Sequence, residues 1–145
     1  MIPGGFGAAK NFFQPSATFA ALGARSQLRP EIAALIRGFY DLRKPIVAIC
    51  IAPAVVGMAL PPLDPPLRLT LGPSAASGNG AAQQMEALGH QTVDCRASSH
   101  VADAAHRVAT TPAYMWDDAP LAAIYDGIQS AIDTAVRWSS SPETR

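Results

Sequence analysis

The residue with the clearest chemical potential is Cys50, which stands between two apolar runs. Residues 46–49 are rich in β-branched side chains and too short for a helix, so they predict a strand buried on both faces. A helix is expected over residues 54–60, with Pro53 in its first turn. A thiol between such a strand and helix lies near free N–H groups and the positive end of the helix dipole, which favour the thiolate. The pattern indicates a nucleophile elbow without its flanking glycines, and the alternative is a small buried hydrophobe at a strand end.

A glycine-rich turn near the start of the chain could supply hydrogen-bond donors to such a nucleophile. Gly4, Gly5 and Gly7 permit positive φ angles and a close approach of backbone N–H groups to a ligand. By itself the pattern is also that of a plain tight turn. Lys10 and Asn11 follow the turn and either line a pocket or bond the local backbone.

The other polar candidates have simpler interpretations. His90 follows a glycine at a helix–strand turn, where we expect it at the surface. His100 and His106 flank a polar loop, and their spacing is not that of metal ligands, so we predict no metal site. Cys95 is expected to be a packed or exposed thiol. Residues 110–114 either line a pocket at a strand end or simply stop the strand.

Strands and helices alternate along the chain and predict an α/β domain with a mostly parallel sheet. A helix starts at Pro30, and its apolar residues Ile32, Leu35, Ile36 and Phe39 form one stripe. Further helices are expected over residues 81–88 and 120–137, strands over 67–71, 91–95 and 107–110, and a long loop over 11–28. The domain is expected to span residues 1–138, with a flexible tail over 139–145. Ligands of such sheets bind beyond the carboxyl ends of the strands, where Cys50 and the glycine turn would meet.

Composition excludes several classes of function. The 145 residues suit one domain, and the 11 basic and 11 acidic residues give no net charge. Without a basic run, there is no electrostatic case for binding nucleic acid or an anionic membrane. No apolar run is long enough to span a membrane. Two cysteines are too few for a disulfide framework, so a reducing compartment, by default the cytoplasm, is expected.

Three motifs resemble a known family. Residues 2–11 (IPGGFGAAKN), 44–54 (KPIVAICIAPA) and 108–115 (VATTPAYM) resemble the ElbB group of isoprenoid-biosynthesis glyoxalases. That group lies in the class I glutamine amidotransferase-like superfamily, beside the PfpI proteases. The resemblance implies a flavodoxin-like parallel-sheet sandwich. Family members carry a further N-terminal section, with the central first strand and a glutamate that pairs with the cysteine. We therefore expect an N-terminally truncated domain without those strands.

The resemblance also implies a cofactor-free reaction on a small aldehyde substrate. Cys50 would attack a 2-oxoaldehyde such as methylglyoxal, and the product would be lactate. Backbone N–H groups of Gly5, Phe6, Gly7 and Ile51 would stabilise the oxyanion, and Lys10, Asn11, Thr111 and Pro112 would line the substrate pocket. No residue can be assigned as the general base, so we predict little or no activity from this chain alone.

Two alternatives to an active enzyme remain open. One is a degenerate, non-enzymatic member whose Cys50 senses oxidants or electrophiles. The other is an incomplete product whose unpaired sheet edge makes it marginally stable or drives it to form a homodimer. Eukaryotic members of the family are mitochondrial, so mitochondria are the alternative compartment.

Overall fold

A three-stranded sheet forms the centre of the molecule. The computed structural model describes residues 1–14, 27–73 and 80–140. Strands β3 (Ile46–Ile49), β7 (Val108–Thr111) and β6 (Val101–Asp103) lie in the order β3-β7-β6. β3 and β7 are parallel, whereas β6 runs antiparallel to β7. The sheet is therefore mixed.

Two smaller sheets lie beside the central one. β4 (Arg68–Leu69) pairs in parallel with β5 (Gln91–Thr92), and β1 (Phe13–Gln14) pairs antiparallel with β2 (Gln27–Leu28). The backbone N–H of Thr70 donates to Thr110 Oγ1 at 3.0 Å, which joins the strand segment that follows β4 to β7.

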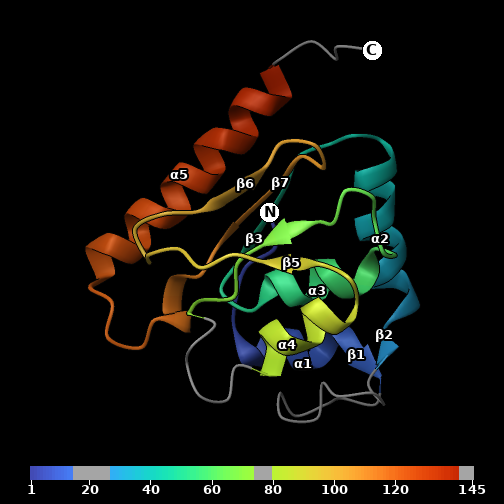
Figure 1. The fold of residues 1–145 in the computed structure, drawn as a ribbon, viewed down its shortest axis with the longest axis horizontal. Helices are drawn as coiled ribbons and strands as arrows, with labels where there is room; N and C mark the ends of the chain where they lie inside the picture. The colour runs from blue at the N-terminus through green and yellow to red at the C-terminus, as the bar shows by residue number, and fades with distance from the viewer. Residues whose placement is uncertain (15–26, 74–79, 141–145) are drawn as a thin grey trace.

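Helices cover both faces of the central sheet (Figure 1). α5 (Leu121–Ser140) lies along one face, against β3, β6 and β7. The other side carries α1 (Phe6–Phe12), α2 (Pro30–Asp41), α3 (Ala52–Ala59) and α4 (Gly80–Ala87). A short 3₁₀ helix, η2 (Ala113–Met115), follows β7. This layered arrangement confirms the expected α/β sandwich. None of the helices in residues 1–14, 27–73 and 80–140 is long and apolar enough to cross a bilayer.

The core explains why β3 and α3 are apolar on every side. All four residues of β3 are buried, and so are seven of the eight residues of α3. A helix without a polar face is stable only when it is surrounded by protein. α3 meets this condition because it packs against β3, α2, α4 and α1.

Several predicted boundaries change in the structure. The segment over residues 96–105, where no strand is predicted, contains β6, whose antiparallel pairing makes the sheet mixed. The glycine turn leads directly into α1, which occupies the start of the expected loop over residues 11–28. Strands β1 and β2 occupy residues 13–14 and 27–28 of that expected loop, and residues 15–26 lie outside the described residues. The strand expected over 91–95 is limited to β5, and α5 continues to Ser140, past the expected start of the tail.

Candidate active site around Cys50

Cys50 occupies a sharp turn between β3 and α3. Its φ angle is 62°, in the left-handed region that costs a non-glycine residue about 1–2 kcal/mol. The turn is held because the Cys50 N–H donates to the carbonyl of Thr111, at the end of β7, at 2.9 Å. The side chain is 8% exposed. A strained backbone angle held by its surroundings is typical of functional sites.

Three backbone N–H groups donate hydrogen bonds to the Cys50 thiol. They belong to Ile51, Gly5 and Tyr114, so the donors come from the turn itself, from the glycine-rich start of the chain and from η2. Gly5 and Ile51 are two of the four donors expected from the sequence. The other two, Phe6 and Gly7, form the first turn of α1. The site is thus assembled from three separate segments.

The donor from Tyr114 was missed at the level of sequence. The sequence predicts that residues 110–114 either line a pocket or stop the strand, and it gives no indication of a backbone donor among them. Its N–H is directed at the thiol because Pro112 starts η2 and Ala113 has a φ angle of 45°. The Tyr114 side chain itself is 58% exposed. A backbone donor leaves little signal in a sequence, although the VATTPAYM motif includes this residue.

The electrostatic state of Cys50 differs from the sequence prediction. Burial raises the pKa of the thiol, and the hydrogen bonds from Ile51, Gly5 and Tyr114 lower it by less. The expectation of a favoured thiolate is therefore wrong for the resting site. Among the described residues, the groups that lower the pKa of the thiol are backbone N–H dipoles and not charged side chains.

Gly4 is required by the close packing of the first turn on Cys50. A Cβ atom added to Gly4 would lie 2.6 Å from Cys50 Cβ and 2.9 Å from the carbonyl oxygen of Ile49. No side chain fits in this space. The same turn needs a second glycine because the φ angle of Gly5 is 115°.

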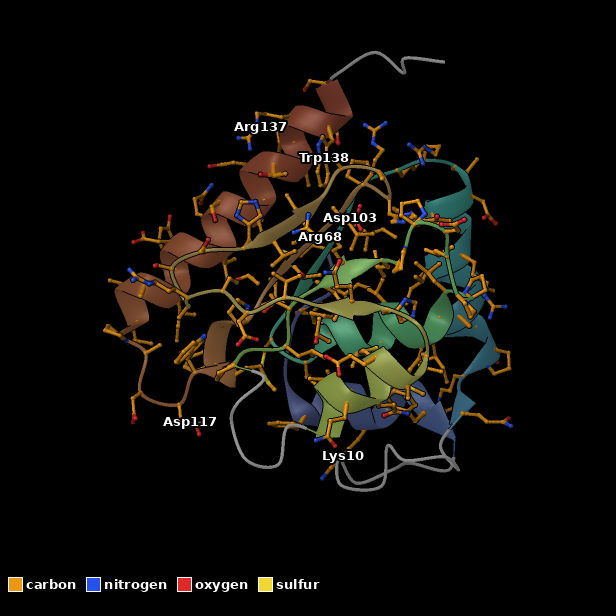
Figure 2. All side chains as sticks on the ribbon, viewed as in Figure 1. Lys10, Arg68, Asp103, Asp117, Arg137 and Trp138 are labelled. Atoms are coloured by element: carbon orange, nitrogen blue, oxygen red, sulfur yellow. The ribbon has the colours of Figure 1, made fainter. Side chains whose placement is uncertain are left out.

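The four residues expected to line a substrate pocket lie in different environments. Lys10 is exposed and projects outward from α1 (Figure 2). Asn11 Nδ2 donates to the carbonyl of Gly7 at 2.9 Å, so its side chain bonds the local backbone. Thr111 is buried, and its hydroxyl donates to the carbonyl of Ser99 at 3.0 Å. Pro112 is buried at the start of η2.

Comparison with known proteins identifies the fold. No protein-family model matches the sequence. The chain is 33% identical to the crystal structure of an isoprenoid biosynthesis protein with an amidotransferase-like domain from Ehrlichia chaffeensis, with a TM-score of 0.76. The match covers 94% of this chain and 57% of that one. The chain has an amidotransferase-like fold.

Curated proteins of similar sequence agree with this fold. It is 34% identical to the glutamine amidotransferase-like class 1 domain-containing protein 3, mitochondrial, of Homo sapiens, over 91% of this chain and 48% of the relative. It is 33% identical to the mitochondrial ES1 protein homolog of Rattus norvegicus, with the same coverage. The chain therefore spans about half the length of the curated relatives it matches.

Two histidines of this chain stabilise the fold through hydrogen bonds between its elements. His90, expected at the surface, is 5% exposed, and its Nε2 donates to the carbonyl of Gly57 at 2.8 Å, which joins α4 to α3. His106 Nε2 donates to the carbonyl of Pro65 at 2.8 Å, and its Nδ1 accepts from the Tyr40 hydroxyl at 2.9 Å. Both rings therefore link elements of the fold.

The remaining histidine and cysteine also have partners away from Cys50. His100 bonds Ser130 Oγ at 2.8 Å and Thr134 Oγ1 at 3.0 Å, both on α5. Cys95 is half-buried, and burial raises its pKa while a hydrogen bond with the Thr70 side chain lowers it. Among the described residues, no hydrogen bond joins Cys50 to a histidine or a carboxylate, and no cluster of side chains could hold a metal ion.

Proposed function

We propose that Cys50 is the nucleophile of a glyoxalase-like site that acts on small 2-oxoaldehydes, in a chain related to the ElbB group. The observation that carries this proposal is the convergence of three backbone N–H groups on one thiol. A nucleophile at a strained strand–helix turn beside such donors has the geometry of a nucleophile elbow with an oxyanion hole. The amidotransferase-like homologues support the same general assignment.

The first chemical step is addition of the thiol to the aldehyde. A bond forms between Cys50 Sγ and the carbonyl carbon, the carbonyl π bond breaks, and the thiol proton ends on the oxygen. The N–H groups of Gly5, Ile51 and Tyr114 stabilise the negative charge that develops on that oxygen. A proton then moves from this carbon to its neighbour, and the hydroxyl proton moves to the neighbouring oxygen, which gives a thioester. Water hydrolyses the thioester to a hydroxy acid and returns the free thiol. Methylglyoxal becomes lactate with no change in net oxidation state.

The second step is expected to be slow in this chain. It needs a base, and loss of a general base typically costs about 10²–10⁴-fold in rate. The described residues offer Cys50 no histidine or carboxylate partner. The raised pKa lowers the thiolate fraction further at neutral pH. We therefore infer that formation of the hemithioacetal is efficient relative to turnover.

The proposal is tested with methylglyoxal and two cysteine variants. Native mass spectrometry in excess methylglyoxal should find one adduct on the wild-type chain and on Cys95→Ala, and none on Cys50→Ala. Cys95 is the matched control because it is the second free thiol and is more exposed than Cys50. An adduct that is unchanged in Cys50→Ala would refute the assignment.

The pH dependence of alkylation gives an independent check. The iodoacetamide labelling rate of Cys50 in the Cys95→Ala background should rise with pH, with a midpoint above the usual range of thiols, because burial raises the pKa. A midpoint below that range would contradict the description of the resting site. Lactate formation as fast as in a glyoxalase with a general base would contradict the inference that the second step is slow in this chain.

The competing proposal is a non-enzymatic thiol sensor. It is favoured by the same lack of a basic partner, since a sensor needs no proton shuttle. Peroxide would oxidise the thiol to a sulfenic acid and be reduced to water. The raised pKa of Cys50 weighs against it, because oxidation requires the thiolate. Rapid oxidation of Cys50 at neutral pH, without an aldehyde adduct, would make the sensor the better description.

The compartment is part of the proposal. The human, rat and zebrafish relatives carry the word mitochondrial in their names. This favours mitochondria over the cytoplasm that the composition suggested. Fractionation of cells that express this protein from its own gene would decide between them.

A further inference from the structure

Two exposed aromatic side chains belong to the segments that bond the Cys50 thiol. Gly5 and Tyr114 both donate their N–H groups to the sulfur, so the backbone of each lies within hydrogen-bond reach of it. Phe6 follows Gly5 directly, and its side chain is 48% exposed. The side chain of Tyr114 is 58% exposed. The two rings therefore start from α1 and η2, close to one reactive atom.

The exposure of these two rings is not explained by the core. An aromatic side chain that stabilises a fold is covered by other side chains, as Phe13 is, with 1% of its surface exposed. A single exposed ring needs no explanation. Here, however, two rings that keep about half of their surface open stand next to donors of the same thiol. They are available to pack on a molecule that reacts with it.

The glycine turn leaves room for such a molecule beside the thiol. Among the described residues, a Cβ atom at Gly5 or at Gly7 would meet nothing within 4 Å, and both glycines are exposed. A Cβ atom at Gly4, by contrast, would collide with Cys50 Cβ. The turn is thus closely packed at Gly4 and open at Gly5, next to Phe6.

The charges around the site favour an uncharged substrate. Among the described residues, apolar surroundings and backbone N–H dipoles set the pKa of the thiol, and no charged side chain acts with them. Lys10 lies on α1 but projects outward (Figure 2). Asp117 and Asp118, in the segment that follows η2, are exposed. A carboxylate on the substrate would therefore lose water without gaining a cation as partner.

We propose that the site selects uncharged aromatic 2-oxoaldehydes, and that Phe6 and Tyr114 pack against their aromatic substituent. This inference rests on the proposed addition of Cys50 to the aldehyde. The aldehyde oxygen is held by the backbone N–H groups, and the substituent extends toward the open side of the turn. Contact between two aromatic rings typically favours binding by about 2–12-fold. A phenyl group makes such contacts, and a methyl group does not.

Protection of Cys50 from iodoacetamide measures this selectivity. In the Cys95→Ala background, the concentration that halves the alkylation rate is determined for phenylglyoxal, methylglyoxal and glyoxylate. Brief incubations keep the slower reaction of these aldehydes with arginine out of the measurement. N-acetylcysteine, treated in the same way, corrects for the intrinsic reactivity of each aldehyde. Relative to this free thiol, phenylglyoxal should protect Cys50 at a concentration at least 2-fold lower than methylglyoxal. Glyoxylate should protect it less well than methylglyoxal.

Variants of the two rings test their part in the selectivity. Phe6→Ala and Tyr114→Ala should each reduce the preference for phenylglyoxal over methylglyoxal by about 2–12-fold. The ratio between the two aldehydes is the readout, because it cancels a general change in the reactivity of the thiol. Tyr114→Phe retains a ring and should keep the preference. Tyr125→Ala is the matched control, since Tyr125 is 66% exposed on α5, and it should leave the ratio unchanged.

The possible outcomes separate this inference from the proposed function. If no aldehyde protects Cys50, the proposed function fails, and the selectivity fails with it. If methylglyoxal protects Cys50 and phenylglyoxal has no advantage over it relative to N-acetylcysteine, the nucleophile stands and the selectivity is refuted. Stronger protection by glyoxylate than by methylglyoxal would also overturn the proposal. So would a preference for phenylglyoxal that survives both Phe6→Ala and Tyr114→Ala.

Discussion

Replacing Gly4 by alanine should damage the Cys50 site and the fold together. The new Cβ would lie 2.6 Å from Cys50 Cβ, about 1 Å closer than the usual carbon–carbon contact of about 3.5–4.0 Å. The carbonyl of Ile49, 2.9 Å away, blocks movement in the other direction. The turn is also held by Ile2, which is bonded to β3. Overpacking of this kind typically costs about 1–3 kcal/mol of unfolding free energy.

The same substitution should lower the reactivity of the site. Relief of the clash displaces the turn, and with it the N–H of Gly5 that bonds the thiol. Removing one donor from an oxyanion hole typically costs about 10²–10³ in rate. The methylglyoxal adduct should therefore form more slowly on Gly4→Ala, by up to that factor. The loss should be present under conditions where urea unfolding shows that the variant is fully folded.

Gly7→Ala is the matched control, because it lies in the same glycine turn. A Cβ there would meet nothing within 4 Å, and the residue belongs to α1, where alanine is favoured over glycine by about 0.5–1 kcal/mol. It should leave adduct formation unchanged and stabilise the chain slightly. Urea unfolding measures both variants. Equal stabilities and equal adduct rates for Gly4→Ala and Gly7→Ala would show that the first turn does not press on Cys50.

Two further predictions concern α5. Burial, helped by the Arg137 charge, lowers the pKa of His100, so the folded state favours the neutral ring. The contribution of His100 to the free energy of unfolding is therefore complete above the unfolded pKa of about 6.5, and it is lost as the pH falls below that value. The urea midpoint should fall between pH 7 and pH 5, and His100→Gln should reduce that fall; an unchanged fall would exclude His100 as its source. Gly127→Ala should cost about 1–3 kcal/mol despite its better helix propensity, because the new Cβ would press on the Ala97 carbonyl and lie 2.9 Å from Thr111 Oγ1. A higher urea midpoint for Gly127→Ala would show that α5 can move away from β7.

The parts of the fold that the sequence predicts well are those set by local signals. The run of residues 46–49 is apolar on every side, so it reads as a buried strand whatever its neighbours are. Pro30 starts α2, and Gly89, with a φ angle of 88°, follows α4, as the sequence suggested. These residues have backbone requirements that few other residue types meet.

The parts that the sequence does not predict depend on distant partners. β6 has three residues, and its Asp103 is buried because the carboxylate accepts from the N–H groups of Arg68 and His106. His106 lies in the local turn, but Arg68 is brought to Asp103 only by the tertiary fold, so the sequence does not indicate that this carboxylate can be buried in a strand. Leu35 and Phe39 fit an inward stripe by periodicity alone, yet both are exposed, because periodicity does not say whether a neighbouring layer is present.

The pKa of Cys50 shows why its residue type and position were not enough to describe the site. The strand–helix turn correctly places N–H groups near the sulfur, but the cost of burying a charge grows with every apolar group packed around it. In the resting site, burial is the larger effect and the thiol stays neutral. This balance can favour catalysis, since donors that are not satisfied by a full thiolate remain available to the oxyanion that forms on addition. Only interactions that strengthen in the transition state raise the rate. The three N–H groups therefore contribute most to addition if the sulfur loses its proton only as the bond to carbon forms.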